Sequence, residues 1–223
     1  MPGRFASSWL LRGNRQARGF VGTSPASGIV QMRILRLEAL VRESRVLEIG
    51  CGALHLALPL IDFLDRGKYV GIDPNEWLRQ QPLERRPTRR LVREKGAVFL
   101  SGDDFDSTEL ARQFDFVFAH SVLSHAAHWQ LGQFLTNTVK VLSPDGRIVA
   151  SIRLAEGNEY GSSGAPDGVD SMDEAWVYPD VSYFSESTLR KAATDAGLDV
   201  RVEPSYTEMY VAERPDEYHD WLV

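Results

Sequence analysis

Short apolar runs alternate with amphipathic stretches from residue 45 towards the end of the chain. Runs rich in Val, Ile and Phe predict seven strands, at residues 46–49, 69–72, 97–100, 116–119, 148–153, 198–202 and 206–212. Parallel strands joined by crossover helices give this alternation. The pattern therefore predicts a Rossmann-like, doubly wound α/β fold with a mostly parallel sheet and helices on both faces.

Two helices stand out between these strands. One is predicted at residues 129–142 and ends before Pro144 and Gly146, because its apolar residues share one helical face: Leu131, Phe134, Leu135, Val139 and Leu142. The other begins after Ser185, a residue type that caps helix N-termini, and stops at Gly197.

Two segments depart from the alternating pattern. The first 37 residues carry arginines but no acid, which is typical of an organellar transit peptide or of a mobile basic arm. We expect a flexible arm or lid at residues 1–28 and one domain at 29–223. A Gly-, Ser- and Asp-rich stretch at about 155–183 is too long for an ordinary connection, and we expect it to shape the acceptor side.

Charge and cysteine content narrow the possible partners. The formal net charge of −6 opposes a phosphate backbone, so we expect a small-molecule acceptor rather than a nucleic acid. Cys51 is the only cysteine, which favours a cytoplasmic protein, and no apolar run is long enough to cross a membrane. The excess of arginine over lysine suggests a bacterial source. A homo-oligomer stays possible.

A glycine turn follows the first predicted strand. The segment from Val46 to Gly52 reads Val-Leu-Glu-Ile-Gly-Cys-Gly, a strand that feeds a turn where a ligand can approach backbone amides. Asp73 ends the next strand, about 20 residues further on, where a carboxylate can accept both hydroxyls of a ribose. His55 replaces the glycine that a dinucleotide fingerprint needs, so NAD and FAD are disfavoured.

Three further blocks follow in order. Residues 99–105 place two acids and an aromatic after the third strand, where an acid can accept from an adenine amino group, although a solvated acidic loop has the same composition. Residues 114–125 are an apolar strand that runs into a polar loop with two histidines. Residues 142–149 form a Pro-Asp-Gly turn that leads into the next strand.

These five blocks, over roughly residues 45–153, resemble class I S-adenosylmethionine-dependent methyltransferases. The resemblance implies S-adenosylmethionine as cofactor, S-adenosylhomocysteine as product and the strand order 3-2-1-4-5-7-6, with a last antiparallel strand after a hairpin at Glu203, Pro204 and Ser205. Glu48, Gly50 and Gly52 would line the methionine and ribose side, Asp73 the ribose hydroxyls, and Asp103 or Asp104 the adenine. Ala119 and His120 would lie beside the sulfonium.

The expected cofactor set is Glu48, Gly50, Cys51, Gly52, Asp73, Pro74, Asp103, Asp104, Phe105, Ala119 and His120. Leu54 replaces a glycine common in the family, which leaves the amino-acid end of the cofactor less defined.

Histidines follow the fourth strand at the carboxyl edge of the predicted sheet, where open α/β sheets bind ligands. A histidine suits the removal of a hydroxyl proton near neutral pH. We therefore predict His125 or His120 as the general base, although either can instead support the loop. His128 is expected near the acceptor or at a helix start.

Aromatic residues mark the acceptor side. Trp176, Tyr178 and Tyr183 are predicted to contact substrate, or alternatively to pack the loop onto the sheet. No metal site is predicted, although a divalent ion is possible at an acidic loop that contains Asp167, Asp170, Asp173 and Glu174.

The leading hypothesis is O-methylation of a small hydroxylated acceptor, a saccharide or natural product. The alternatives are a small-molecule N-methyltransferase and an S-adenosylmethionine-binding protein without transferase activity. A nicotinamide-dependent oxidoreductase is a third class, and His55 argues against it.

Overall fold

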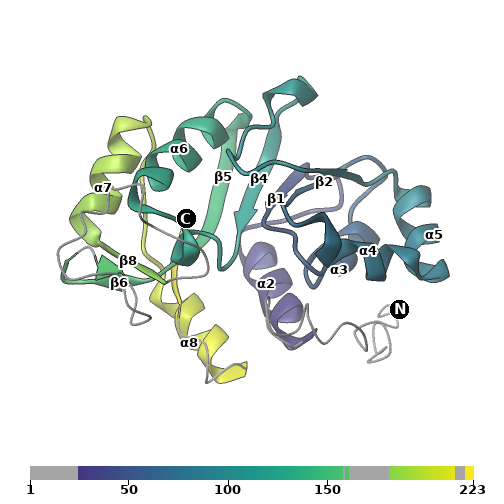
Figure 1. The fold of residues 1–223 in the computed structure, drawn as a ribbon, viewed down its shortest axis with the longest axis horizontal. Coiled ribbons are helices and arrows are strands. Elements are labelled where there is room, and N and C mark those ends of the chain that lie inside the picture. The colour runs from purple at the N-terminus through teal and green to yellow at the C-terminus, as the bar shows by residue number, and fades with distance from the viewer. Residues whose placement is uncertain (1–24, 158, 161–180, 214–218) are drawn as a thin grey trace. The chain divides into compact units, whose positions relative to one another are not determined.

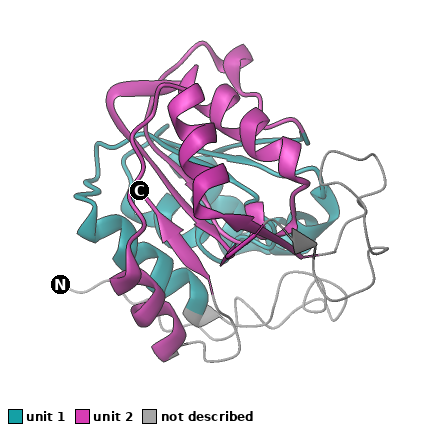
Figure 2. Ribbon diagram, turned by 90° about the vertical axis from the view of Figure 1, so that its left-hand side faces the viewer, with its two compact units in different colours: residues 1–103 teal, residues 104–223 magenta. Residues whose placement is uncertain are grey.

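The computed structural model describes residues 25–157, 159–160, 181–213 and 219–223. The chain divides into two compact units, residues 1–103 and 104–223, which Figure 2 draws in teal and magenta. The predicted arm lies outside the described residues up to residue 24, and most of the predicted insertion lies outside them as well. A helix begins at Pro25, so residues 25–28 of the expected arm are helical.

Unit 1 is an α/β layer with three parallel strands. Its elements are α2 (Pro25–Leu37), β1 (Val46–Ile49), α3 (Ala57–Phe63), β2 (Tyr69–Ile72), α4 (Glu76–Glu84), α5 (Arg86–Lys95) and β3 (Val98–Leu100). The strand order β3-β2-β1 is the predicted one. Val46 pairs with Tyr69 and Ile49 with Ile72, so β1 and β2 end at the same edge.

Strands β1 and β2 were predictable because strands that are buried on both faces are mainly apolar. All four residues of β1 and all four of β2 are buried. Helix α5 ends at Gly96, whose left-handed backbone (φ 62°) closes the last turn before β3.

Unit 2 contains the remaining elements, several of which are labelled in Figure 1. They are η1 (Thr108–Leu110), β4 (Phe114–Ala119), η2 (Leu123–His125), α6 (His128–Val139), β5 (Leu142–Ile152), β6 (Leu154–Ala155), β7 (Glu159–Tyr160), β8 (Ser182–Ser185), α7 (Glu186–Asp195), α8 (Pro204–Glu213) and β9 (Asp220–Leu222). Strands β4 and β5 are parallel, and β9 pairs with β5 in the antiparallel direction.

The end of the predicted sheet is different from the prediction. The strand expected at 198–202 is reduced to one antiparallel bridge, in which Val202 pairs with Leu222 of β9. Leu222 also pairs with Ala150 of β5, so the bridge lies on the outer edge of β9. The expected order 4-5-7-6 is thus partly observed. Strand β9 takes the place of the expected antiparallel strand 7 beside β5, and the single bridge at Val202 takes the place of strand 6.

The strand predicted at 206–212 is wrong, because Pro204–Glu213 form helix α8. Tyr206 and Tyr210 are both buried and lie four residues apart, which is helical spacing. Pro204 is the first residue of this helix, a position that proline fits well. The hairpin expected around Pro204 is therefore replaced by a helix start. The side chain of Glu203 accepts the backbone N–H of Ser205 at the same end.

The two predicted helices are confirmed with shifted ends. Helix α6 ends at Val139, and Leu142 already belongs to β5, which runs through Pro144 and Gly146. Helix α7 begins after Ser185, whose hydroxyl accepts the Thr188 N–H at 3.1 Å. This is the N-cap bond expected from the residue type.

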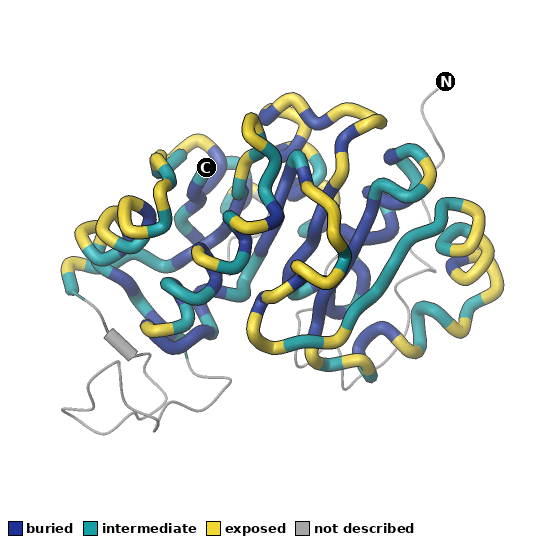
Figure 3. The backbone as a smooth tube through the Cα atoms, turned by 90° about the horizontal axis from the view of Figure 1, so that it is seen from above, coloured by how far each residue is buried: buried dark blue, intermediate teal, exposed yellow. Residues whose placement is uncertain are grey.

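Burial follows the strands in each unit. Figure 3 shows the strands as mainly buried and the outward turns of the helices as exposed. The largest enclosed side chains of unit 2 include Trp221, Tyr210, Phe118 and Phe134. None of the helices in the described part of the chain is both long enough and apolar enough to cross a membrane.

Candidate cofactor and acceptor sites

The glycine turn after β1 has the geometry that its sequence predicts. Gly50 and Gly52 have φ values of 75° and 44°, which glycine adopts without a Cβ penalty. The backbone N–H groups of Gly50 and Cys51 both donate to the carbonyl of Ile72, at 2.8 and 3.2 Å. These bonds fix the turn to the end of β2.

Leu54 keeps the left-handed backbone of the glycine that it replaces in the family pattern. Its φ is 67° and its side chain is fully buried. A left-handed conformation costs a residue with a Cβ about 1–2 kcal/mol. Burial of the leucine side chain offsets that cost, so the turn retains its shape without the third glycine.

Asp73 is held between the glycine turn and the start of α4. Its Oδ2 accepts the N–H of Gly52 at 2.8 Å and its Oδ1 accepts the N–H of Asn75 at 2.7 Å. Burial raises the pKa of this carboxyl, and the two N–H bonds oppose the rise. Each oxygen keeps a lone pair beyond these bonds, so the carboxylate fits the paired hydroxyls of a ribose. Pro74, the next residue, is exposed.

A buried arginine, which sequence reasoning missed, links the ends of β2 and β3. Arg79 of α4 is 6% exposed, and its guanidinium donates to the backbone carbonyl of Asp73 at 2.9 Å and to Ser101 Oγ at 2.8 Å. It also lies 3.5 Å from Glu76, which accepts a hydrogen bond from Ser101. Its position in a polar helix gave no signal of this role.

Glu48 and Tyr69 form a buried pair beneath the turn. Tyr69 Oη donates to Glu48 Oε2 at 2.6 Å, and both side chains are almost fully enclosed. Burial raises the pKa of Glu48 to about 8, an effect only partly opposed by the Tyr69 hydrogen bond. Burial also raises the pKa of Tyr69. At neutral pH Glu48 is therefore mainly a neutral acid.

The acidic block after β3 is divided between different environments. Asp103 is exposed at the end of unit 1. In unit 2, Asp104 Oδ1 accepts the Asp106 N–H at 3.1 Å. Phe105 is buried with φ 62°, and its ring packs edge-to-face on Phe134 with centroids 5.6 Å apart. The predicted adenine contacts of these residues remain predictions.

His120, directly after the buried Ala119 of β4, lies in an aromatic cluster. Its ring centroid is 4.9 Å from those of Tyr210 and His219, and 5.4 Å from Trp221, on which it stacks at 24°. Sequence reasoning missed these three partners. We call His120, Tyr210, His219 and Trp221 the imidazole–aromatic cluster.

His219 is the most enclosed imidazole of this cluster, at 3% exposure. Burial above all, together with electrostatic repulsion from Arg153 and His125, lowers its pKa to about 3. Its Nδ1 is buried and has no hydrogen-bond partner among the described residues. His219 is therefore a neutral ring at physiological pH.

Of the other residues predicted on the acceptor side, some lie within the described ranges and some lie outside them. His128 begins α6, and its Nε2 donates to the backbone carbonyl of Tyr183 at 3.0 Å, while its ring packs on Phe184. This bond connects α6 with β8 and gives His128 a structural contact. His125 ends η2 and is half-buried. Trp176, Tyr178 and the acidic loop of Asp167, Asp170, Asp173 and Glu174 lie outside the described residues. Within the described ranges, no group of three or more His, Cys, Asp or Glu side chains is arranged to hold a metal ion.

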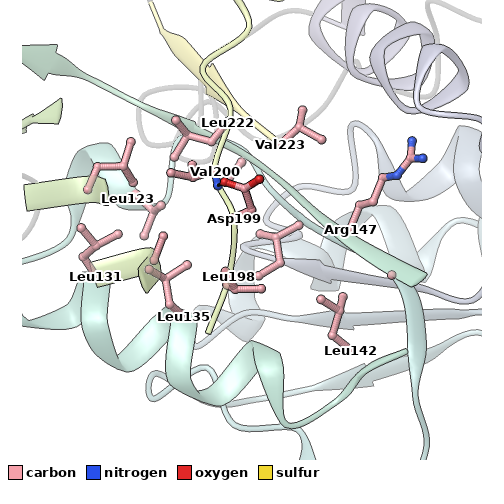
Figure 4. Close-up of a pocket in the computed structure, with 15 residues that line it drawn as sticks. Leu123, Leu131, Leu135, Leu142, Arg147, Leu198, Asp199, Val200, Leu222 and Val223 are labelled. Atoms are coloured by element: carbon pink, nitrogen blue, oxygen red, sulfur yellow. Dashed lines mark hydrogen bonds between the residues drawn. The ribbon is translucent and has the colours of Figure 1, made fainter. Parts of the chain in front are cut away.

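Unit 2 also has an apolar cavity of about 140 Å³. Figure 4 shows Leu131 and Leu135 of α6 and Leu222 of β9 among its walls. Its walls are mainly aliphatic, and none of the predicted site residues lines it. Arg147 and Asp199 are its charged lining residues, and it is separate from the predicted site residues.

Comparisons with known proteins agree with this geometry. Residues 47–148 match a family model described as a methyltransferase domain. The fold is similar to DesVI from Streptomyces venezuelae (17% identity, 92% of this chain and 94% of that chain, TM-score 0.58). It is also similar to magnesium protoporphyrin IX methyltransferase from Synechocystis PCC 6803 with bound SAM (16% identity, 94% of this chain and 83% of that chain, TM-score 0.59). A third similar structure is the glycopeptide N-methyltransferase MtfA complexed with S-adenosylhomocysteine (13% identity, 86% of this chain and 85% of that chain, TM-score 0.61).

Proposed function

We propose that the chain is a class I S-adenosylmethionine-dependent methyltransferase, and that it methylates a hydroxyl oxygen of a small molecule with a histidine as general base. The observation that carries the proposal is the position of His120 directly after β4 and of His125 at the end of η2, the next element along the chain. In open α/β sheets, ligands bind at the carboxyl ends of the strands.

Unit 1 supplies the residues for the nucleoside and methionine ends of the cofactor. The Asp73 carboxylate, fixed by the N–H groups of Gly52 and Asn75, is the proposed ribose acceptor. The sulfonium of S-adenosylmethionine supplies an activated methyl group. Because Glu48 is buried beside Tyr69 and mainly neutral, it can donate a hydrogen bond on the methionine side without adding a second full negative charge.

The proposed base is His125 or His120. An O-methyltransferase must hold the hydroxyl in line with the methyl group and accept its proton. His120 is held in place by rings on more than one side, whereas His125 lies on a single helical turn and is half-buried. The placement of His120 favours orientation of the acceptor, and that of His125 favours proton acceptance from it.

Two other activities are the alternatives to this proposal. An N-methyltransferase of a small amine would need no strong base, and the similar MtfA structures are of a glycopeptide N-methyltransferase. A cofactor-binding protein without turnover would bind S-adenosylhomocysteine yet show no product with any acceptor.

A product analysis separates these proposals. Wild type, His125→Gln and His120→Gln are incubated with S-adenosylmethionine and paired panels of hydroxyl and amine acceptors, and products are identified by mass spectrometry. The proposal expects an O-methyl product whose rate rises with pH in wild type and falls by about 10²-fold or more in His125→Gln. Trp129→Phe, a change at an exposed position of α6, is the control expected to keep the rate. N-methyl products, or unchanged rates in both histidine variants, would contradict it.

A further inference from the structure

Three strand ends meet at one edge of unit 2 and bring basic groups together. Ala119 pairs with Ala150 in the parallel β4–β5 ladder, so the residues that follow these strands lie at the same edge. Strand β9 is antiparallel to β5, which places its beginning at that edge. His120 follows β4, Arg153 follows β5, and His219 precedes β9.

Arg153 is held by backbone and side-chain contacts and has no acidic partner within the described ranges. Its backbone carbonyl accepts the Phe184 N–H at 2.9 Å. Its guanidinium donates to the Tyr183 hydroxyl at 3.2 Å and lies over the same ring, 5.8 Å from the centroid. Among the described residues, no carboxylate forms an ion pair with it, and its Nε is buried without a hydrogen-bond partner. A half-buried cation left in this state is costly unless a ligand completes it.

One acid, Asp220, is next to His219 in the chain, and it accepts the backbone N–H of Leu154 at 2.9 Å. Among the described residues, the charged groups that lower the pKa of His219 are Arg153 and His125. Within that part of the chain, this edge combines a guanidinium, imidazoles and flat rings.

We propose that Arg153 holds a carboxylate of the acceptor, while His120, the half-buried ring of the cluster, contacts its flat part. A guanidinium binds a carboxylate through two parallel N–H bonds, and such charge-assisted bonds are about twice as strong as neutral ones. The buried Nδ1 of His219 provides a further polar atom for this ligand. The inference rests on the proposed function, since it names the chemical class of the acceptor for that site.

The carboxylate can serve as an anchor beside a methylated hydroxyl or can itself accept the methyl group. In both cases its oxygen atoms lie on Arg153 in the bound state. Product analysis distinguishes them, because an anchor leaves a methyl ether on the ring and a free acid, whereas the second case gives a methyl ester. In each case the methyl moves from sulfur to oxygen and leaves S-adenosylhomocysteine.

The test uses pairs of probes that differ in one charge. Calorimetric titrations with 3-hydroxybenzoate and 3-hydroxybenzamide, and with the corresponding cinnamate and cinnamide pair, are run with and without S-adenosylhomocysteine. We expect each carboxylate to bind wild type roughly tenfold or more tightly than its amide. Arg153→Gln should remove that preference and Arg153→Lys should retain part of it. Arg190→Gln, the same change at an exposed arginine of α7, should leave it intact.

Each outcome decides the matter. Equal binding of acid and amide, binding of neither, or a preference that survives in Arg153→Gln overturns the inference. The Arg153→Lys variant and thermal unfolding of every variant show whether a loss comes from misfolding. Failure of the proposed function gives a different result, because no O-methyl product would then form in the product analysis while the preference of wild type for the carboxylate probes persists.

Discussion

The buried carboxyl of Glu48 should make the stability of the protein fall as pH rises. The carboxyl has a pKa of about 4.5 when exposed and about 8 in the folded protein, because burial disfavours its charged form. Folded protein therefore holds a proton that the unfolded chain releases above pH 4.5. Stability from this group is fully present below that value and is lost as pH rises towards 8.

The magnitude follows from the two pKa values. One pKa unit corresponds to about 1.4 kcal/mol, so the rise from 4.5 to about 8 amounts to about 5 kcal/mol over the whole range. Between about pH 5.5 and 7.5, which lies inside this window, the loss is about 2.5 kcal/mol. Glu48→Gln keeps an acceptor for the Tyr69 hydroxyl but cannot ionise, so it should not show this loss.

Urea unfolding at several pH values measures the effect. The free energy of unfolding of wild type minus that of Glu48→Gln should fall by about 2.5 kcal/mol from about pH 5.5 to 7.5. Glu109→Gln, a change at an exposed glutamate, is the matched control and should give a flat difference. Tyr69→Phe removes the bond that favours the charged form and should extend the loss to higher pH. A flat difference for Glu48→Gln would refute the reasoning.

Three further predictions test other parts of the structure. His219→Asn should shift acid unfolding to lower pH, because the buried neutral ring has a pKa of about 3 and costs stability as pH falls from about 6.5; circular dichroism against pH would show this, and an unchanged midpoint would contradict it. Gly28→Ala should destabilise unit 1 by about 1–3 kcal/mol, since a Cβ there would lie 2.2 Å from the carbonyl of His55. Gly132→Ala, a change at a helical glycine with open space around it, should instead raise the stability by up to about 1 kcal/mol. If urea unfolding showed that both glycine variants change the free energy of unfolding in the same direction, the packing argument would be contradicted. Arg79→Met should weaken S-adenosylhomocysteine binding by about tenfold or more in calorimetry while Arg79→Lys retains part of it, and unchanged affinity would show that the buried arginine does not shape the site.

Unit 1 was largely predictable because two of its strands, β1 and β2, are buried on both faces. Short apolar runs of this kind are typical of strands covered on both faces. The glycines and the acid that follow them lie at the carboxyl ends of neighbouring parallel strands, so their positions could be predicted from the order of the strands. Asp73 lies where its spacing predicts, on the N–H of Gly52. Arg79 could not be predicted, because its burial depends on the ends of β2 and β3 lying next to each other.

Unit 2 was predictable only in part. The run from Tyr206 to Ala212 contains aromatic and β-branched residues that favour a strand, but Tyr206 and Tyr210 are buried on one face of helix α8. Strand β9 has three residues, too few for a recognisable alternation. His219 and Trp221 therefore gave no signal, although they complete the cluster around His120. Long-range pairing with β5 decides their position, and local sequence does not encode it.

The most direct test of the account is a calorimetric titration of wild type and Asp73→Ala with S-adenosylhomocysteine and, separately, NADH. The bonds from Gly52 and Asn75 to Asp73 predict micromolar binding of S-adenosylhomocysteine, clear weakening in the variant and no preference for NADH. Absence of S-adenosylhomocysteine binding, tighter binding of NADH, or equal affinity of wild type and Asp73→Ala would contradict the proposed cofactor site.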